Sequence, residues 1–208
     1  HKMGQQDFSH EVYEAMAGCL ACKSCAGQCP VKVNVPEFRS RFLELYHSRY
    51  LRPLKDYLIG SLEFTIPYLA RVPRLYNFVM GVGPVRFILE HVAGMVDSPL
   101  LSMTDFDAVC RRWGVEIATP ELLSALGDQQ RARSVILVQD AFTRYFETPV
   151  LSDWIELISR LGYQVYIAPF APNGKPLQVQ GFIKAFEKAA RFNGEALHQL
   201  QEYEIPLV

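Results

Sequence analysis

Four of the five cysteines lie close together near the start of the chain, in the segment CLACKSCAGQCP. Cys19, Cys22, Cys25 and Cys29 are followed directly by Pro30, which gives the spacing C-x2-C-x2-C-x3-C-P. Thiolates are soft ligands, and this spacing is typical of bacterial segments that bind a 4Fe–4S cluster. Three thiols spaced in this way in a tight turn can meet three corners of one cube. The sequence therefore predicts a 4Fe–4S cluster held by Cys19, Cys22 and Cys25, with Cys29 as the candidate fourth ligand.

The residues between the cysteines favour a cluster over zinc. Ala21, Ala26 and Gly27 are small, which lets backbone N–H groups approach the cluster sulfurs, and Pro30 fixes the chain as it leaves the segment. A structural zinc site usually takes two ligand pairs from separate segments, and a contiguous run fits that geometry poorly. A zinc-binding structural or interaction module without a redox role remains the alternative.

The fourth ligand is open on spacing alone. In two-cluster proteins the last cysteine of this motif serves the other cluster, yet the chain has no second motif. Cys29 therefore binds either the same cube or a site completed by another part of the protein. Cys110, alone in FDAVCRRW, is interpreted as a small buried hydrophobic residue and kept as a reserve ligand.

No residue is predicted to be catalytic. Gly81 and Gly83 in GVGPV suggest a dinucleotide loop, but no strand precedes them, Pro84 follows, and Arg86 stands where a further glycine is needed. Four of the five histidines stand apart from one another in the sequence, and packing is their default role. They are His10, His47, His91 and His198.

The sequence pattern of the first half of the chain predicts helices. Residues 9–18 are expected to form a short helix with Ser9 as its cap, and a second helix should begin at Pro36 and end before Pro53. Residues 54–110 are apolar and aromatic but interrupted by proline, so short helices joined at sharp corners are expected. The breaking residues are Pro67, Pro73, Pro84 and Pro99.

The second half predicts alternating strands and helices. Strands are expected at 134–139, 163–168 and 205–208, with helices at 148–161, closed by Gly162, and at 177–192. Such alternation implies a parallel sheet. The third strand is cut off by the end of the chain, which predicts a fragment of a longer protein. The fold class is thus α+β overall, with an N-terminal all-α domain followed by a parallel α/β domain truncated at its C-terminus.

The three expected segments are a helical domain at 1–53, a proline-broken helical connector at 54–129 and a partial α/β domain at 130–208. The net charge of -1 gives no basic face for nucleic acid, and no apolar run is long enough to span a membrane. No N-terminal apolar run followed by a small-residue cleavage site is seen in this sequence, and a cytoplasmic location, which includes the periphery of the inner membrane, is expected.

The segments CLACKSCAGQCPVKVNVPEFRSRFLELYH, VQDAFTRYFE and PNGKPLQVQGF together resemble the C-terminal part of large bacterial FAD-linked oxidases of the D-2-hydroxyglutarate or D-lactate dehydrogenase type. The resemblance covers nearly the whole chain. It implies a helical ferredoxin-like domain followed by an α/β domain like the cysteine-rich domain of heterodisulfide reductases. In that relative, cysteines after the first and second strands hold a second metal site; here Ala141, Pro172 and Asn173 occupy the matching places, so no second thiolate site is expected.

The function that the resemblance implies is an electron-transfer portion of an FAD-linked 2-hydroxy acid dehydrogenase. The flavin and its domains would lie upstream in the same polypeptide, and an electron acceptor would be the further partner. This portion alone is expected to be non-catalytic, because it holds neither a hydride acceptor nor a base. Asn173, Gly174 and Lys175 are expected only to shape a loop at the strand ends.

Overall fold

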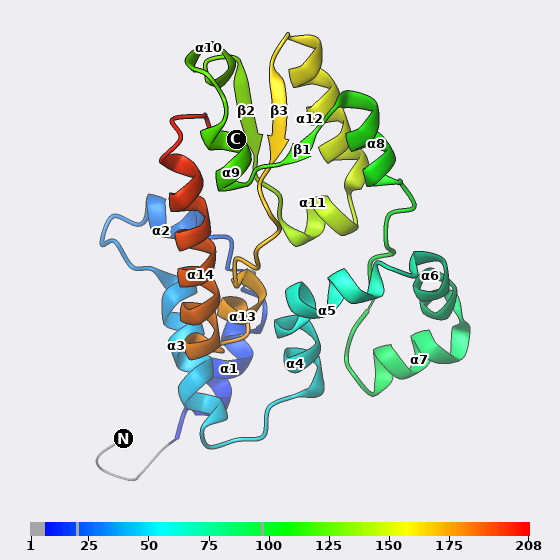
Figure 1. Ribbon diagram of the computed structural model, residues 1–208. Coiled ribbons are helices and arrows are strands. Elements are labelled where there is room, and N and C mark those ends of the chain that lie inside the picture. Colours follow the sequence, from blue (N-terminus) through cyan, green and yellow to red (C-terminus); the bar gives the residue numbers. More distant parts are fainter. Residues whose placement is uncertain (1–6, 20, 97) are drawn as a thin grey trace. The chain divides into compact units, whose positions relative to one another are not determined.

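Figure 1 shows the computed structural model, which describes residues 7–19, 21–96 and 98–208. Short helices dominate the described chain, and its strands form one small parallel sheet, so the expected α+β class is confirmed. Contacts divide the chain into two compact units. The first runs to Leu62 and includes Gly174–Lys188; the second comprises Glu63–Asn173 and Ala189–Val208. Whether the three expected segments fold as separate domains stays a prediction.

The first unit is helical. Within it α1 packs against α3, and α13 packs against α3 and α4 (Figure 1). The segment from Gly174 thus returns late in the sequence to complete the unit that carries the four neighbouring cysteines. The helices are α1 (Ser9–Ala17), α2 (Ser24–Gln28), α3 (Val35–His47), α4 (Leu54–Gly60), α13 (Lys175–Val179) and the first part of α14 (Ile183–Gln201).

Two sequence expectations for this unit need correction. Ser9 is the first residue of α1 and not its cap; its backbone N–H donates to the Asp7 carboxylate at 3.0 Å. The continuous helix expected over 177–192 is wrong, because α13 ends and α14 begins on either side of Gly181. The φ of Gly181 is +71°, a left-handed conformation that interrupts a right-handed helix. The helix expected from Pro36 is confirmed by α3.

Short helices occupy the middle of the chain, as expected. Pro73 and Pro84 each lie in the first turn of a helix, where the missing N–H has no intrahelical partner to lose. Pro67 is different and corrects the prediction: it lies inside α5, and the backbone N–H of Ala70 donates to the Ile66 carbonyl at 2.8 Å, which carries the helix past the proline. These helices are α5 (Leu62–Leu69), α6 (Pro73–Gly81), α7 (Gly83–His91) and α8 (Phe106–Trp113).

The sheet has three parallel strands in the order β1-β3-β2. The strands β2 (Ser134–Leu137) and β3 (Gln164–Ile167) confirm two predictions, whereas β1 (Glu116–Ile117) was not predicted because two residues show no periodicity. The expected C-terminal strand is reduced to a parallel bridge in which Leu207 pairs with Ile136. The connecting helices are α9 (Pro120–Ser124), α10 (Asp128–Arg131), α11 (Ala141–Tyr145) and α12 (Thr148–Arg160).

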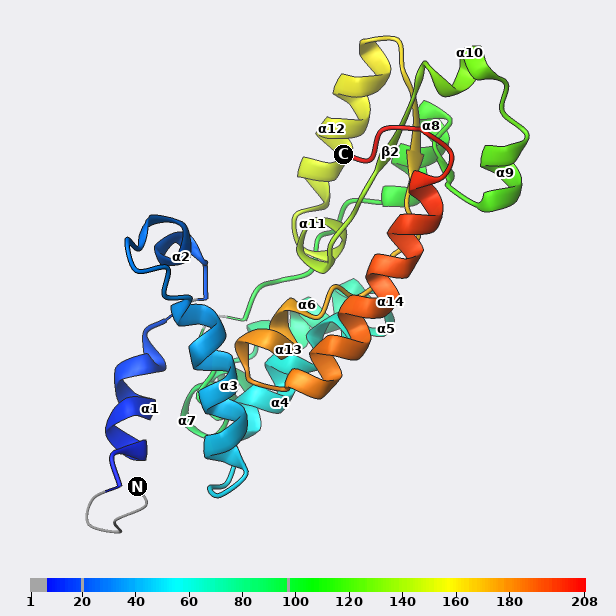
Figure 2. The same ribbon diagram turned by 90° about the vertical axis from the view of Figure 1, so that its left-hand side faces the viewer.

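Both faces of the sheet are covered by apolar side chains. Alternate residues along β3 and just after it point to opposite faces: Val165 and Ile167 pack with α8 and α12, while Tyr166 and Ala168, which follows the strand, pack with α9 and the end of α14. Figure 2 shows the strands lying between α12 and α9. Burial on both faces explains why the strands are read as apolar runs. The α/β expectation for this part of the chain is therefore confirmed.

Candidate metal centre

The four clustered cysteines lie on a short stretch between α1 and α3. Cys19 follows the end of α1, Cys22 lies in the loop before α2, Cys25 lies inside α2 and Cys29 is its C-terminal cap. Cys22 and Cys25 are exposed, Cys19 and Cys29 are half-buried, and all four are free thiols. The stretch is held locally, since the Cys29 N–H donates to the Cys25 carbonyl at 3.0 Å.

The backbone turns sharply on both sides of Cys22. Ala21 has a φ of +51° and Lys23 a φ of +64°, both in the left-handed region that L-residues rarely adopt. Ala21 is also 2% exposed, so the peptide before Cys22 is a fixed and buried point of the loop. Backbone strain of this kind persists where surrounding contacts hold it and is common at ligand-binding sites.

The donor set fits the group that the spacing predicts. Four cysteine sulfurs in a stretch that contains no carboxylate suit a soft metal centre. A Cβ added at Gly27 would meet no atom within 4 Å, so there is open space beside α2. Among the described residues, which omit Leu20, no three His, Cys, Asp or Glu side chains converge on one point. Convergence of Cys19, Cys22, Cys25 and Cys29 therefore stays a prediction.

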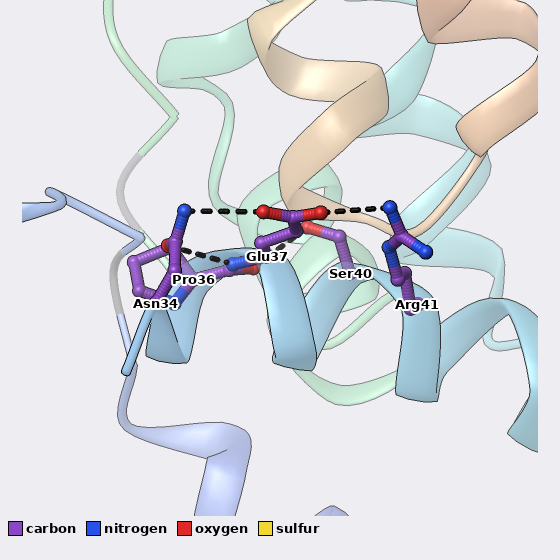
Figure 3. Close-up of polar contacts among 5 residues, drawn as sticks. All are labelled: Asn34, Pro36, Glu37, Ser40 and Arg41. Carbon is purple, nitrogen blue, oxygen red and sulfur yellow. Dashed lines mark hydrogen bonds and ion pairs between the residues drawn. The ribbon is translucent and has the colours of Figure 1, made fainter. Parts of the chain in front are cut away.

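The helix that leaves the cysteine stretch has a firmly fixed start (Figure 3). The Asn34 side chain accepts from the Glu37 N–H at 3.2 Å, and the Ser40 hydroxyl donates to the Pro36 carbonyl at 3.0 Å. Glu37 also pairs with Arg41 across one helical turn at 2.8 Å. The N-cap contact satisfies one of the free N–H groups at the start of α3. It thereby fixes the point after Cys29 at which the chain enters α3.

Two arginines join segments of the first unit that are far apart in the sequence. Arg39, 9% exposed, donates to the Met16 carbonyl at 3.1 Å and to the Val179 carbonyl. Arg52 donates to the Gln180 carbonyl, and its guanidinium lies 4.0 Å from the centroid of the Phe182 ring. Each guanidinium thus binds carbonyls of the returning segment 174–188. The turn at Gly181 is therefore anchored to the helices around the cysteines.

Lys175 reaches the cysteine stretch itself. Its ammonium donates to the Ala21 carbonyl at 2.9 Å, and it also lies 3.5 Å from the Gln178 amide oxygen. Burial lowers the pKa of Lys175, the charge of Lys23 lowers it further, and the thiols of Cys22 and Cys19 oppose the shift. Lys175 therefore lies within electrostatic reach of two predicted ligands. Spacing gave no signal for this, because the two segments are separated by most of the chain.

A buried polar group lies at the other end of α3. His47 Nε2 is 3.5 Å from Asp56 Oδ2, and Arg52 Nη1 is 3.6 Å from the same oxygen. Burial lowers the pKa of His47, helped by the Arg52 charge, and burial raises the pKa of Asp56 against the nearby cations. The sequence reading missed this neighbour, because Asp56 belongs to the next helix. The group links α3 to α4.

The α/β part carries no further thiolate set among its described residues. Ala141 is 1% exposed and begins α11, which Asp140 caps through its carboxylate. Cys110 packs against the core between the sheet and α12, and burial raises its pKa, which agrees with its interpretation as a small hydrophobic residue. An open cavity of about 1210 Å³ lies at the amino ends of β2 and β3. Ligands of open α/β sheets bind at the opposite, carboxyl ends.

These observations define a class of protein in which a small parallel α/β fold is joined to a helical unit with a cysteine-rich turn. The chain is 64% identical over 205 residues to a D-2-hydroxyglutarate dehydrogenase of Pseudomonas putida. Proteins of the same name are 45% identical in Escherichia coli and 39% identical in Haemophilus influenzae. Each match covers 99% of this chain but 20% of the relative, so the chain spans about a fifth of the length of these curated relatives.

The other comparisons add no assignment. No protein-family model matches the chain. No solved structure matches it. In the described part of the chain, no helix combines the length and the apolar character that crossing a membrane requires.

Proposed function

We propose that this chain is the iron–sulfur electron-transfer portion of a larger FAD-linked 2-hydroxy acid dehydrogenase that relays electrons from reduced flavin to an acceptor. The observation that carries the proposal is the C-x2-C-x2-C-x3-C-P stretch with its four free thiols between α1 and α3. A 4Fe–4S cluster, when bound, accepts and gives up single electrons. Cys19, Cys22, Cys25 and Cys29 would hold it.

D-2-hydroxyglutarate is the substrate we favour over D-lactate. The support is that the relatives matching nearly the whole chain are all named D-2-hydroxyglutarate dehydrogenase. Because they are about five times longer than the matched region, the flavin and the substrate site would belong to other parts of the polypeptide. This portion would bind one cluster and contribute no catalytic residue to substrate oxidation.

The test uses the full-length polypeptide, prepared without oxygen, with Cys22→Ser as the variant. A serine hydroxyl is a hard ligand and replaces a soft thiolate poorly, so iron and acid-labile sulfide should fall well below the parent's content. Cys110→Ser is the matched control, because that thiol packs in the other unit and should leave iron unchanged. A colourless parent that contains zinc would instead support the structural-module alternative.

Kinetic measurements then distinguish an electron-transfer role of the cluster from a purely structural role. In a single turnover, reduction of the flavin by D-2-hydroxyglutarate should survive in Cys22→Ser, because the substrate-oxidising groups are untouched. Steady-state transfer to the physiological acceptor should collapse. If the variant reduced that acceptor as fast as the parent, the relay role would be wrong. Because the relatives are about five times longer than this portion, the iron that Cys22→Ser loses is the relevant count. A loss of about eight irons per chain, the content of two cubes, would contradict the single-cluster proposal.

A further inference from the structure

A lysine from the returning segment is the one distant cation that contacts the interior of the cysteine stretch among the described residues. Lys175 begins α13, directly after Gly174, whose φ is +77°. Its Nζ donates to the Ala21 carbonyl at 2.9 Å. Ala21 and Lys175 belong to the same compact unit, so this contact lies within one unit of the chain.

The contact fixes the peptide that precedes a predicted ligand. In a planar trans peptide the carbonyl and the following N–H point in opposite directions. A carbonyl of Ala21 held by Lys175 therefore turns the Cys22 N–H away from the lysine. Ala21 is 2% exposed, so water cannot readily replace the ammonium as a donor, and an unpaired buried carbonyl is costly.

The ammonium also places a positive charge beside the stretch. The thiols of Cys22 and Cys19 lie close enough to interact with it electrostatically. A fixed positive charge near a redox centre favours the form with one more electron, because that form is more negative. Two unit charges within roughly 10 Å of each other near a protein surface interact strongly enough to change a redox or binding equilibrium by about tenfold or more.

We infer that Lys175 is a positioning residue for the proposed metal centre: its ammonium holds the Ala21 carbonyl and raises the midpoint potential of the centre that Cys19, Cys22, Cys25 and Cys29 would form. The inference rests on the proposed function, since it requires a cluster in this stretch. It assigns to the segment 174–188 a role at the centre, in place of a loop at the strand ends.

Three substitutions in the full-length polypeptide separate charge from hydrogen bonding. Lys175→Met removes both, Lys175→Gln keeps a donor without the charge, and Lys175→Arg keeps both. Lys184→Met is the matched control, because Lys184 is exposed on α14 in the same unit and its loss changes the net charge equally. The readouts are iron and sulfide per chain and the midpoint potential from an EPR-monitored redox titration.

The expected result is that Lys175→Gln retains iron while its reduced-to-oxidised ratio at a fixed ambient potential falls about tenfold, which is about 59 mV for a one-electron couple. Lys175→Met should show the same shift with lower iron retention, and Lys175→Arg and Lys184→Met should match the parent. Loss of iron in Lys175→Met that Lys175→Arg rescues also supports the inference.

Two outcomes overturn it. An unchanged potential in an iron-replete Lys175→Gln variant removes the electrostatic role. Loss of iron from Lys175→Arg as well would show that the position serves folding and not charge. A parent without iron and sulfide is a different result, since it refutes the proposed function itself before any variant is compared.

Discussion

Replacing Gly181 with alanine tests whether the returning segment is locked against the helix that follows the cysteines. A Cβ at this position would lie 2.6 Å from Leu43 Cβ, 2.9 Å from the Ser40 carbonyl oxygen and 3.1 Å from the Glu44 nitrogen. Two of these three atoms are backbone of α3 and cannot rotate away. The φ of +71° adds a second penalty for any residue with a Cβ.

The magnitude follows from these two terms. The left-handed conformation costs alanine about 1–2 kcal/mol, and overpacking a tight contact costs about 1–3 kcal/mol. The more restricted unfolded chain of alanine returns about 0.4–1 kcal/mol. We therefore expect a loss of about 2–4 kcal/mol in local stability. At about 1.4 kcal/mol for each factor of ten, this is a loss of roughly 30-fold to 700-fold in protection.

Hydrogen–deuterium exchange read by mass spectrometry is the assay, because it reports local opening in the full-length polypeptide. Peptides that cover α3 and residues 174–188 should lose protection together in Gly181→Ala. Gly114→Ala, with a φ of +63° and no atom within 4 Å of the added Cβ, isolates the conformational term and should lose only about 1 kcal/mol at the end of α8.

Gly60→Ala is the second control. There the added Cβ meets the tip of the Phe182 ring at 2.9 Å, which can shift, and alanine is the better helix former by about 1 kcal/mol. Its net effect should stay below about 1 kcal/mol. If Gly181→Ala left α3 as protected as in the parent, the close contact between Gly181 and α3 would be irrelevant to the stability of this unit.

Two further predictions concern α3. Burial and the Arg52 charge hold the pKa of His47 below its ordinary 6.5, so the folded state binds this proton more weakly than the unfolded state does. The stability that the neutral, buried His47 contributes is present above about pH 6.5 and is lost as the pH falls through the folded pKa. Exchange protection of α3 should therefore fall more steeply below pH 6.5 in the parent than in His47→Gln. Parallel pH profiles of the two proteins would contradict this. Asn34→Ala removes the N-cap and should cost about 1 kcal/mol in the stability of α3. Arg41→Ala removes only the exposed pair with Glu37 and should cost less than about 0.5 kcal/mol; equal losses in the two variants would mean that the cap is not the stabilising contact.

The local patterns that the sequence could determine are those set by near neighbours. Cysteine spacing predicted a metal-binding stretch, which stays a prediction. Proline positions and apolar runs predicted the helix from Pro36, the short middle helices and two strands of the sheet. These features depend on backbone restrictions and on burial periodicity, which act over a few residues. The apolar residues next to Cys110 in the sequence also predicted that it packs against the core, as the structure shows.

Tertiary structure decided everything that joins distant residues. The break at Gly181 and the return of 174–188 to the first unit arise because Arg39 and Arg52 bind carbonyls there and α3 leaves no room for a side chain. The pairing of His47 with Asp56 needs two helices to meet. The contact of Lys175 with Ala21 spans residues far apart in the chain. No periodicity encodes such a meeting, because it results from how whole elements pack. This packing places the charge of Lys175 beside cysteines that lie near the beginning of the chain.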